Sequence, residues 1–237
     1  MRVAQVHRVR ECRLRLTAGP WVFALDNAAA IARHWGNRLA DNPSFFNGRV
    51  LVMETFDING DVLDAGFMET EFASFLYWKD RGYPEAGAYD GFGSALIRAS
   101  GGEVILARQR AGNVNAGLIY MPGGFIDPRD VTADGSVDID ASIERELLEE
   151  TGLSACAFDR QPGYLVTILP FQVSIAVEFV SPLTAEELRR SLVSEIGRQS
   201  DPELEDFVIY RRAPRADDQD VVAFSRHVLA AVLDEEA

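Results

Sequence analysis

Residues 145–153 read Arg-Glu-Leu-Leu-Glu-Glu-Thr-Gly-Leu. Glu and Leu favour helix, so Glu146, Glu149 and Glu150 are expected at i, i+3 and i+4 on one helix face. Like charges at this spacing repel one another unless a cation lies between them. Hard oxygen ligands suit Mg²⁺ or Mn²⁺ rather than Zn²⁺. The stretch therefore predicts a helix that binds a divalent metal ion.

The neighbours of these glutamates support the same interpretation. Arg145 lies four residues before Glu149 and is expected to hold its carboxylate in place. Gly152 can end the helix in a left-handed conformation. The alternative is a solvated acidic face on an ordinary helix. The complete string, downstream of Pro122-Gly123-Gly124, favours the metal site over that alternative.

This string resembles the Nudix box of the Nudix hydrolases, which runs Gly, five residues, Glu, seven residues, Arg-Glu-apolar-any-Glu-Glu-any-Gly-apolar. Its second half matches completely at residues 145–153. Counted from Gly124, the family places the Arg seven residues earlier, so residues 126–140 form an extended loop. The family's middle Glu would fall near Asp130 or Val137, with Asp138 one place off, and it is assigned to none of them.

The resemblance implies an α/β (α+β) fold, a Nudix-type α/β/α sandwich with a mixed sheet. It also implies Mg²⁺-dependent hydrolysis of a diphosphate linkage in a nucleotide-like substrate. Carried over by position, Glu146, Glu149 and Glu150 become metal ligands and Arg145 becomes their orienting partner. The carbonyl of Gly123 becomes a further ligand.

A narrower resemblance concerns the substrate. The segments 42–48, 73–76 and 106–110 are similar to those of the Nudix-type UDP-glucose/UDP-galactose diphosphatases of animals, which implies products UMP and sugar 1-phosphate. A second hypothesis keeps the chemistry and takes ADP-ribose, CoA or a dinucleotide. A third is a binding module that senses a nucleotide sugar without cleaving it, because the first half of the signature is displaced.

Many Nudix enzymes are dimers, so the resemblance also implies a possible homodimer.

Four residues are candidates for substrate binding. Arg108 and Arg110 lie at i and i+2 after a predicted strand, so their side chains are expected to point the same way and to bind phosphate oxygens. Phe46 and Asn47 are expected to hold a base or sugar by stacking and hydrogen bonding. The alternatives are a solvated sheet face for the arginines and loop packing for Phe46.

A general base is also required to take the proton from the attacking water. Three acids in the later part of the chain are candidates: Glu178 on a predicted strand, and Glu203 and Glu205 before the next one. Nudix enzymes often use an acid from this region, which favours Glu203 or Glu205. Each of the three is otherwise a solvated surface glutamate.

Composition excludes several classes of function. The net charge of −14 argues against non-specific binding to nucleic acid or anionic membrane, since both need basic surface. No apolar run reaches the ~18 residues of a membrane span, and the Arg-rich N-terminus lacks the apolar core of a signal peptide. A cytoplasmic protein with a small-molecule partner is expected. The two cysteines, Cys12 and Cys156, are expected to be free thiols in the core.

The 237 residues are enough for one large or two small domains. We expect an N-terminal α/β subdomain over residues 1–90 and the hydrolase domain over 91–237. Apolar periodicity and turn residues predict helices over 27–41, 71–81, 141–151, 183–194 and 218–233. They predict strands over 48–55, 62–69, 95–99, 104–108, 118–121, 164–169, 172–180 and 207–212, and a polar loop over 127–140.

Overall fold

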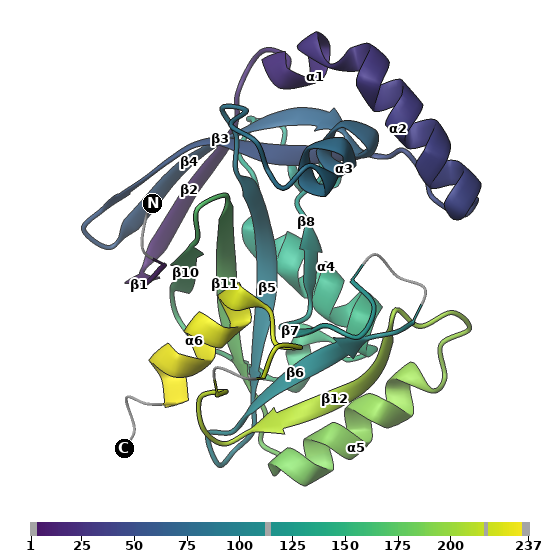
Figure 1. The fold of residues 1–237 in the computed structure, drawn as a ribbon. Coiled ribbons are helices and arrows are strands. Elements are labelled where there is room, and N and C mark those ends of the chain that lie inside the picture. The colour runs from purple at the N-terminus through teal and green to yellow at the C-terminus, as the bar shows by residue number, and fades with distance from the viewer. Residues whose placement is uncertain (1–3, 112–114, 216–217, 234–237) are drawn as a thin grey trace. The chain divides into compact units, whose positions relative to one another are not determined.

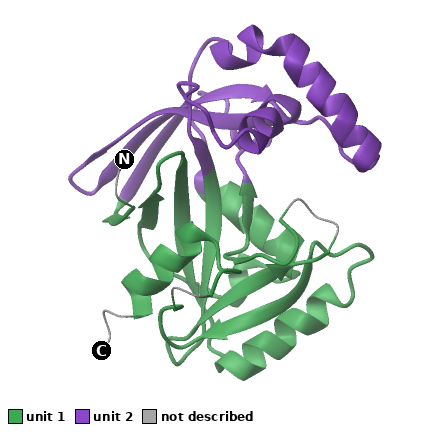
Figure 2. Ribbon diagram, viewed as in Figure 1, with its two compact units in different colours: residues 1–10, 92–124, 140–237 green, residues 11–91, 125–139 purple. Residues whose placement is uncertain are grey.

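A computed structural model (Figure 1) describes residues 4–111, 115–215 and 218–233. The chain forms two compact units (Figure 2), and each is built from more than one segment. Unit 1 comprises residues 1–10, 92–124 and 140–237, and unit 2 comprises residues 11–91 and 125–139. The break after residue 91 lies next to the boundary expected near residue 90. Two segments differ from the expected domains: residues 1–10 belong to unit 1, and residues 125–139 belong to unit 2.

Unit 1 is built on a mixed sheet that has nine strands among the described residues. Its main path runs β1-β10-β11-β5-β6-β12. Three short strands lie off this path: β7 pairs with β6, β8 with β5 and β9 with β11. The main strands are β1 Gln5–Val9, β10 Tyr164–Ile168, β11 Gln172–Val180, β5 Asp90–Arg98, β6 Val104–Gln109 and β12 Leu204–Tyr210. The short strands are β7 Ile119–Tyr120, β8 Gly123–Phe125 and β9 Asp159–Arg160.

In the described part of unit 1, the helices that accompany this sheet are α4 Ile139–Thr151, α5 Ala185–Ile196 and α6 Ala223–Leu233. Figure 1 shows α6 in front of the sheet and α4 behind it. The apolar face of α6, with Val228 and Leu229, packs on Leu96, Leu106 and Leu165 in one buried cluster. A 3₁₀ turn, η2 Ala155–Ala157, follows α4. The predicted α/β fold with a mixed sheet and helices is confirmed.

Unit 2 contains a three-stranded sheet in the order β2-β4-β3. Its strands are β2 Glu11–Leu16, β4 Val62–Glu71 and β3 Arg49–Asn59, and its helices are α1 Val22–Asp26, α2 Ala28–Asp41 and α3 Phe72–Asp80. β2 runs parallel to β4, and β3 runs antiparallel to it. The β3–β4 turn contains Gly60 at φ 62°, the left-handed conformation that glycine adopts without strain. Trp21, Val52, Phe75 and Trp78 form part of its core.

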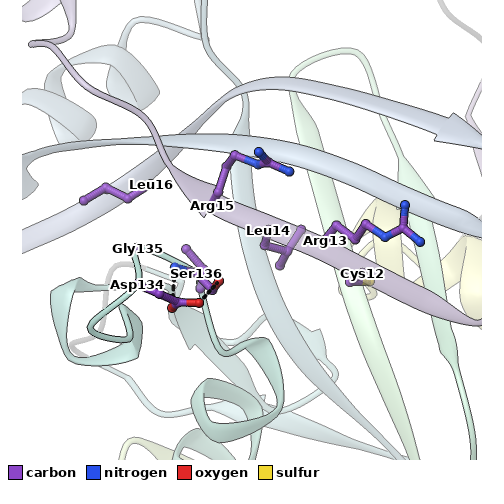
Figure 3. A pocket seen from close by; sticks show the side chains of 9 residues that line it. Cys12, Arg13, Leu14, Arg15, Leu16, Asp134, Gly135 and Ser136 are labelled. Carbon is purple, nitrogen blue, oxygen red and sulfur yellow. Dashed lines mark hydrogen bonds between the residues drawn. The ribbon is translucent and has the colours of Figure 1, made fainter.

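The extended loop before α4 is structured and belongs to unit 2. It begins with a 3₁₀ turn, η1 Pro128–Asp130. Further along, Leu16 N–H donates to the Gly135 carbonyl at 2.8 Å, and Val137 N–H donates to the Leu14 carbonyl at 2.9 Å. The loop therefore pairs with the edge of β2. Residues 12–16 of β2 and residues 134–137 line a hollow of about 530 Å³, and Figure 3 shows side chains that line it.

The predicted polar loop over 127–140 is thus partly wrong, because a 3₁₀ turn and edge pairing replace an irregular connection. The backbone groups at the edge of β2 provide the partners for this pairing. The other predicted helices and strands are present with shifted ends. The largest shifts are at β5, which begins at Asp90 and not at residue 95, and at the last helix, which begins at Ala223 and not at residue 218. In the described parts of the chain, no helix is both long enough and apolar enough to span a membrane.

Candidate metal centre

The helix that carries the glutamates, α4, is anchored by its apolar face. Ile143 and Leu147 are buried, as their spacing on the helix predicts. The helix ends where Gly152 adopts φ 74° and donates its N–H to the Leu148 carbonyl at 2.9 Å. This left-handed C-terminus confirms the predicted role of the glycine.

Glu150 is the most deeply buried glutamate of the helix, with 5% of the residue exposed. Its carboxylate accepts a hydrogen bond from the Gly123 N–H at 2.8 Å. Burial raises the pKa of Glu150 well above its ordinary value, and repulsion from Glu203 and Glu146 raises it further. A carboxylate in this environment is favourable only when it binds a proton or a cation.

Glu146 lies one helical turn earlier and is partly buried. Burial raises the pKa of Glu146 to about 7, and Glu149 and Glu203 add to this, while Arg145 opposes it. The Arg145 guanidinium lies 3.5 Å from the Glu146 carboxylate, whereas the sequence assigned it to Glu149. Glu149 itself is exposed on the helix.

The two glycines upstream are required by close approaches. A Cβ on Gly123 would lie 2.2 Å from the Gly93 carbonyl oxygen, because β8 runs directly against β5 there. A Cβ on Gly124 would lie 2.4 Å from a carboxylate oxygen of Glu146. The Gly-Gly pair therefore allows the strand to pair closely with β5 and leaves room for the Glu146 side chain. Gly123 also contributes the N–H to Glu150.

A further carboxylate comes from the segment before β12. Glu203 acts electrostatically on both Glu146 and Glu150, so it lies near them, and its carbonyl accepts the Arg110 N–H at 2.9 Å. Glu205 is exposed at an irregularity in the pairing of β12 with β6. Glu178 is in an ion pair with Arg98 at 3.1 Å.

Gln109 and Tyr120 are part of the site and were not predicted. The Gln109 side chain, with 3% of the residue exposed, hydrogen-bonds both Glu150 and Tyr120. The alternation of side chains along a strand could have indicated Gln109. If Arg108 and Arg110 share one face of the sheet, Gln109 between them must face the other way.

The two arginines are held by protein acceptors. Arg108 donates to the Gly117 carbonyl at 3.0 Å and to Asp220 at 3.4 Å. Arg110 forms an ion pair with Asp201. A phosphate oxygen would have to compete with these carboxylates, so the role of the arginines in substrate binding stays a prediction.

Phe46 and Asn47 lie in unit 2, whereas the carboxylates lie in unit 1. The Asn47 side chain accepts the Ala73 N–H at 2.8 Å and donates to Glu71 at 3.0 Å. It thereby satisfies a backbone donor in the first turn of α3. Phe46 is 82% exposed. The contact of Phe46 and Asn47 with a base or sugar stays a prediction.

The carboxylates fit a hard divalent cation by donor type and by charge. Glu146 and Glu150 are oxygen donors whose raised pKa values reflect burial beside other carboxylates. Within residues 4–111, 115–215 and 218–233, no group of three or more His, Cys, Asp or Glu side chains is already arranged as a metal site. Mg²⁺ usually keeps several waters and takes only one or two protein carboxylates together with substrate phosphates.

The pKa of Glu146 predicts how stability and metal binding depend on pH. In metal-free protein its folded-state pKa of about 7 exceeds the ordinary value of 4.5. The folded chain then holds the proton more tightly than the unfolded chain between these values, so this group reduces stability as pH rises from 5 to 8. Mg²⁺ binds the ionised form, so its addition should raise Tm more at pH 8 than at pH 6.

Thermal melting with Mg²⁺ and with EDTA at both pH values checks this prediction. The Glu146→Gln variant is the control, and its Mg²⁺-dependent rise in Tm should be smaller and less dependent on pH. An equal Mg²⁺ effect at pH 6 and pH 8 in the native chain would contradict the prediction.

Comparison with known proteins gives one family match: residues 90–171 match the NUDIX domain. No curated protein matches the chain. Among solved structures, MutT protein from Methanosarcina mazei Go1 is 21% identical at a TM-score of 0.38, over 62% of this chain and 94% of that one. The bifunctional NMN adenylyltransferase/ADP ribose pyrophosphatase from Francisella tularensis is 17% identical at a TM-score of 0.41. The match covers 69% of this chain and 46% of that one. A NUDIX hydrolase from Nitrosomonas europaea is 15% identical at a TM-score of 0.30. The match covers 62% of this chain and 84% of that one.

Proposed function

We propose that this chain, whose residues 90–171 match the NUDIX domain, cleaves the diphosphate linkage of a nucleoside diphosphate derivative with the help of Mg²⁺ or Mn²⁺. One observation carries the proposal. Glu150 is buried and Glu146 is partly buried beside Gly123 and Gly124, and burial and repulsion from neighbouring carboxylates raise both pKa values. Such a pair is costly to the fold and is explained by a cation that it holds.

Glu146 and Glu150 would hold the metal ion, with Glu149 on the same helix and the Gly123 carbonyl as further ligands. When bound, the ion would neutralise the phosphate oxygens, polarise phosphorus and lower the pKa of a bound water. Glu203, which lies near Glu146 and Glu150, would take the proton from the attacking water. Arg145 would orient the Glu146 carboxylate, which it approaches at 3.5 Å.

For the substrate we propose a UDP-sugar, cleaved to UMP and sugar 1-phosphate. The support is the similarity of segments 42–48, 73–76 and 106–110 to the UDP-sugar diphosphatases. The second candidate keeps the chemistry that the family resemblance implies and takes ADP-ribose, CoA or a dinucleotide as substrate. A binding module without turnover is less favoured, because all three helix glutamates are present.

Product chromatography tests the activity and the substrate together. Native protein is incubated with UDP-glucose, ADP-ribose and CoA in separate reactions, with Mg²⁺ and with EDTA. UMP formed from UDP-glucose with Mg²⁺ only would support the full proposal. Cleavage of another compound would overturn the UDP-sugar assignment, whereas intact compounds throughout, with nucleotide bound, would favour the binding module.

The two late acids give a matched pair of variants for the general base. Glu203→Gln is expected to lower kcat by ~10²-fold or more, the usual contribution of a general base. Glu205→Gln removes the same charge from an exposed position two residues away and should leave kcat within about twofold. Steady-state kinetics at saturating Mg²⁺ measures both, and the reverse ranking would assign the base to Glu205.

The dimer and the cytoplasmic location are proposals that rest on the family resemblance and composition alone. Light scattering of the purified chain gives the molar mass directly. A mass near 26.2 kDa would indicate a monomer, and twice that value would indicate the dimer.

A further inference from the structure

We propose that Gln109 is a positioning residue for the metal centre, holding the Glu150 carboxylate in the orientation that binds the ion. This inference rests on the proposed function, since it acts through a glutamate that we assign as a metal ligand. It adds a residue from the sheet, outside the signature helix and the glycine loop.

The backbone of Gln109 is fixed on two sides. Its N–H donates to the Leu118 carbonyl at 3.0 Å, and its carbonyl accepts the Gly117 N–H at 2.9 Å. On the other edge of β6 it pairs with Leu204 of β12. A residue whose backbone is bonded on both sides has little freedom, so its side chain leaves the sheet in a defined direction.

That side chain reaches Glu150. The hydrogen bond between them lowers the pKa of the Glu150 carboxyl, in opposition to burial. An ionised carboxylate only accepts hydrogen bonds, so the amide nitrogen of Gln109 must face it. Together with the Gly123 N–H at 2.8 Å, Gln109 gives the carboxylate two donors from two different strands. The other lone pairs of the two oxygens stay available for a metal ion.

The amide is itself held in place by Tyr120, a second hydrogen-bond partner of the Gln109 side chain. The Tyr120 hydroxyl also accepts a hydrogen bond from the Asn115 side chain at 3.1 Å. Asn115, Tyr120, Gln109 and Glu150 thus form a connected series from the β6–β7 connection to the metal centre. Groups that orient metal ligands in this way commonly matter ~10–100-fold for metal affinity or activity.

The Gln109→Met variant removes both donors and keeps the length and volume of the side chain. We expect the Mn²⁺ dissociation constant and the Mg²⁺ concentration for half-maximal activity to rise ~10-fold or more, with KM for the nucleotide little changed. Gln161→Met is the matched control, because Gln161 is a partly exposed glutamine whose side chain hydrogen-bonds Asp159 at 2.9 Å. This control should bind metal as the native chain does.

Electron paramagnetic resonance of free Mn²⁺ gives the dissociation constant without requiring turnover. Native Mn²⁺ affinity in folded Gln109→Met would overturn the inference. If that variant fails to fold, Gln109→Asn is used, which keeps the amide but withdraws it by one methylene, and native affinity there would also overturn it. Absence of Mn²⁺ binding by the native chain would instead overturn the proposed function.

Discussion

Glu150→Gln is expected to abolish most of the hydrolysis while leaving the metal-free fold at least as stable as the native one. The substitution keeps shape and volume but removes a charge that is buried beside Glu146 and Glu203. Loss of one charge-stabilising group typically lowers kcat by ~10²-fold or more. Removal of a desolvated carboxylate should raise Tm in EDTA, because the native fold bears the cost of burying it.

Kinetics at saturating Mg²⁺ and thermal melting in EDTA measure the two effects on one preparation. Glu144→Gln is the matched control, since Glu144 is an exposed glutamate of the same helix and its charge has no place in the metal centre. Glu150→Gln that melts well below the native chain would show that Glu150 stabilises the fold. Near-native kcat would place the metal site elsewhere.

Gly124→Ala is expected to lower kcat by a similar factor, ~10²-fold, through steric displacement of Glu146. The new Cβ would lie 2.4 Å from an oxygen of that carboxylate, which is too close for both groups to keep their positions. The carboxylate is the end of a flexible side chain, so it can rotate away at small cost to the fold. The variant should therefore remain folded and bind Mn²⁺ more weakly.

Gly123→Ala is the comparison that separates a metal-site effect from a fold effect. Its Cβ would meet the backbone carbonyl oxygen of Gly93 at 2.2 Å, and a strand cannot move away as a side chain can. Overpacking of this kind typically costs about 1–3 kcal/mol of unfolding free energy. Urea unfolding should show a clear loss of unfolding free energy for Gly123→Ala and a small loss for Gly124→Ala. Equal losses would contradict the assignment of Gly124 to the metal centre.

The helix that carries the candidate site could be predicted because its signals are local. Helix spacing predicted the three glutamates on α4, and the apolar residues Ile143 and Leu147 predicted the face it buries. The glycine at its end also behaves as expected, with φ 74° at Gly152. Each of these depends on residues within a few positions of one another, where periodicity is informative.

Contacts between distant segments could not be predicted from the sequence in the same way. Gln109 and Glu150 are 41 positions apart, counted from their residue numbers, and β6 must be correctly placed before their contact becomes visible. The choice between Glu203 and Glu205 likewise depends on an irregularity in the pairing of β12. The extended loop before α4 looked like an irregular connection because the backbone groups that it pairs with belong to β2, more than a hundred residues earlier.

The measurement that tests the metal centre most directly is a Mn²⁺ titration of the native chain and of Glu146→Gln/Glu150→Gln, followed by the paramagnetic resonance of the free ion. We predict that the native chain takes up Mn²⁺, more tightly at pH 8 than at pH 6, and that the double variant is folded but takes up little. Equal uptake by the two proteins would contradict the assignment of Glu146 and Glu150 as metal ligands.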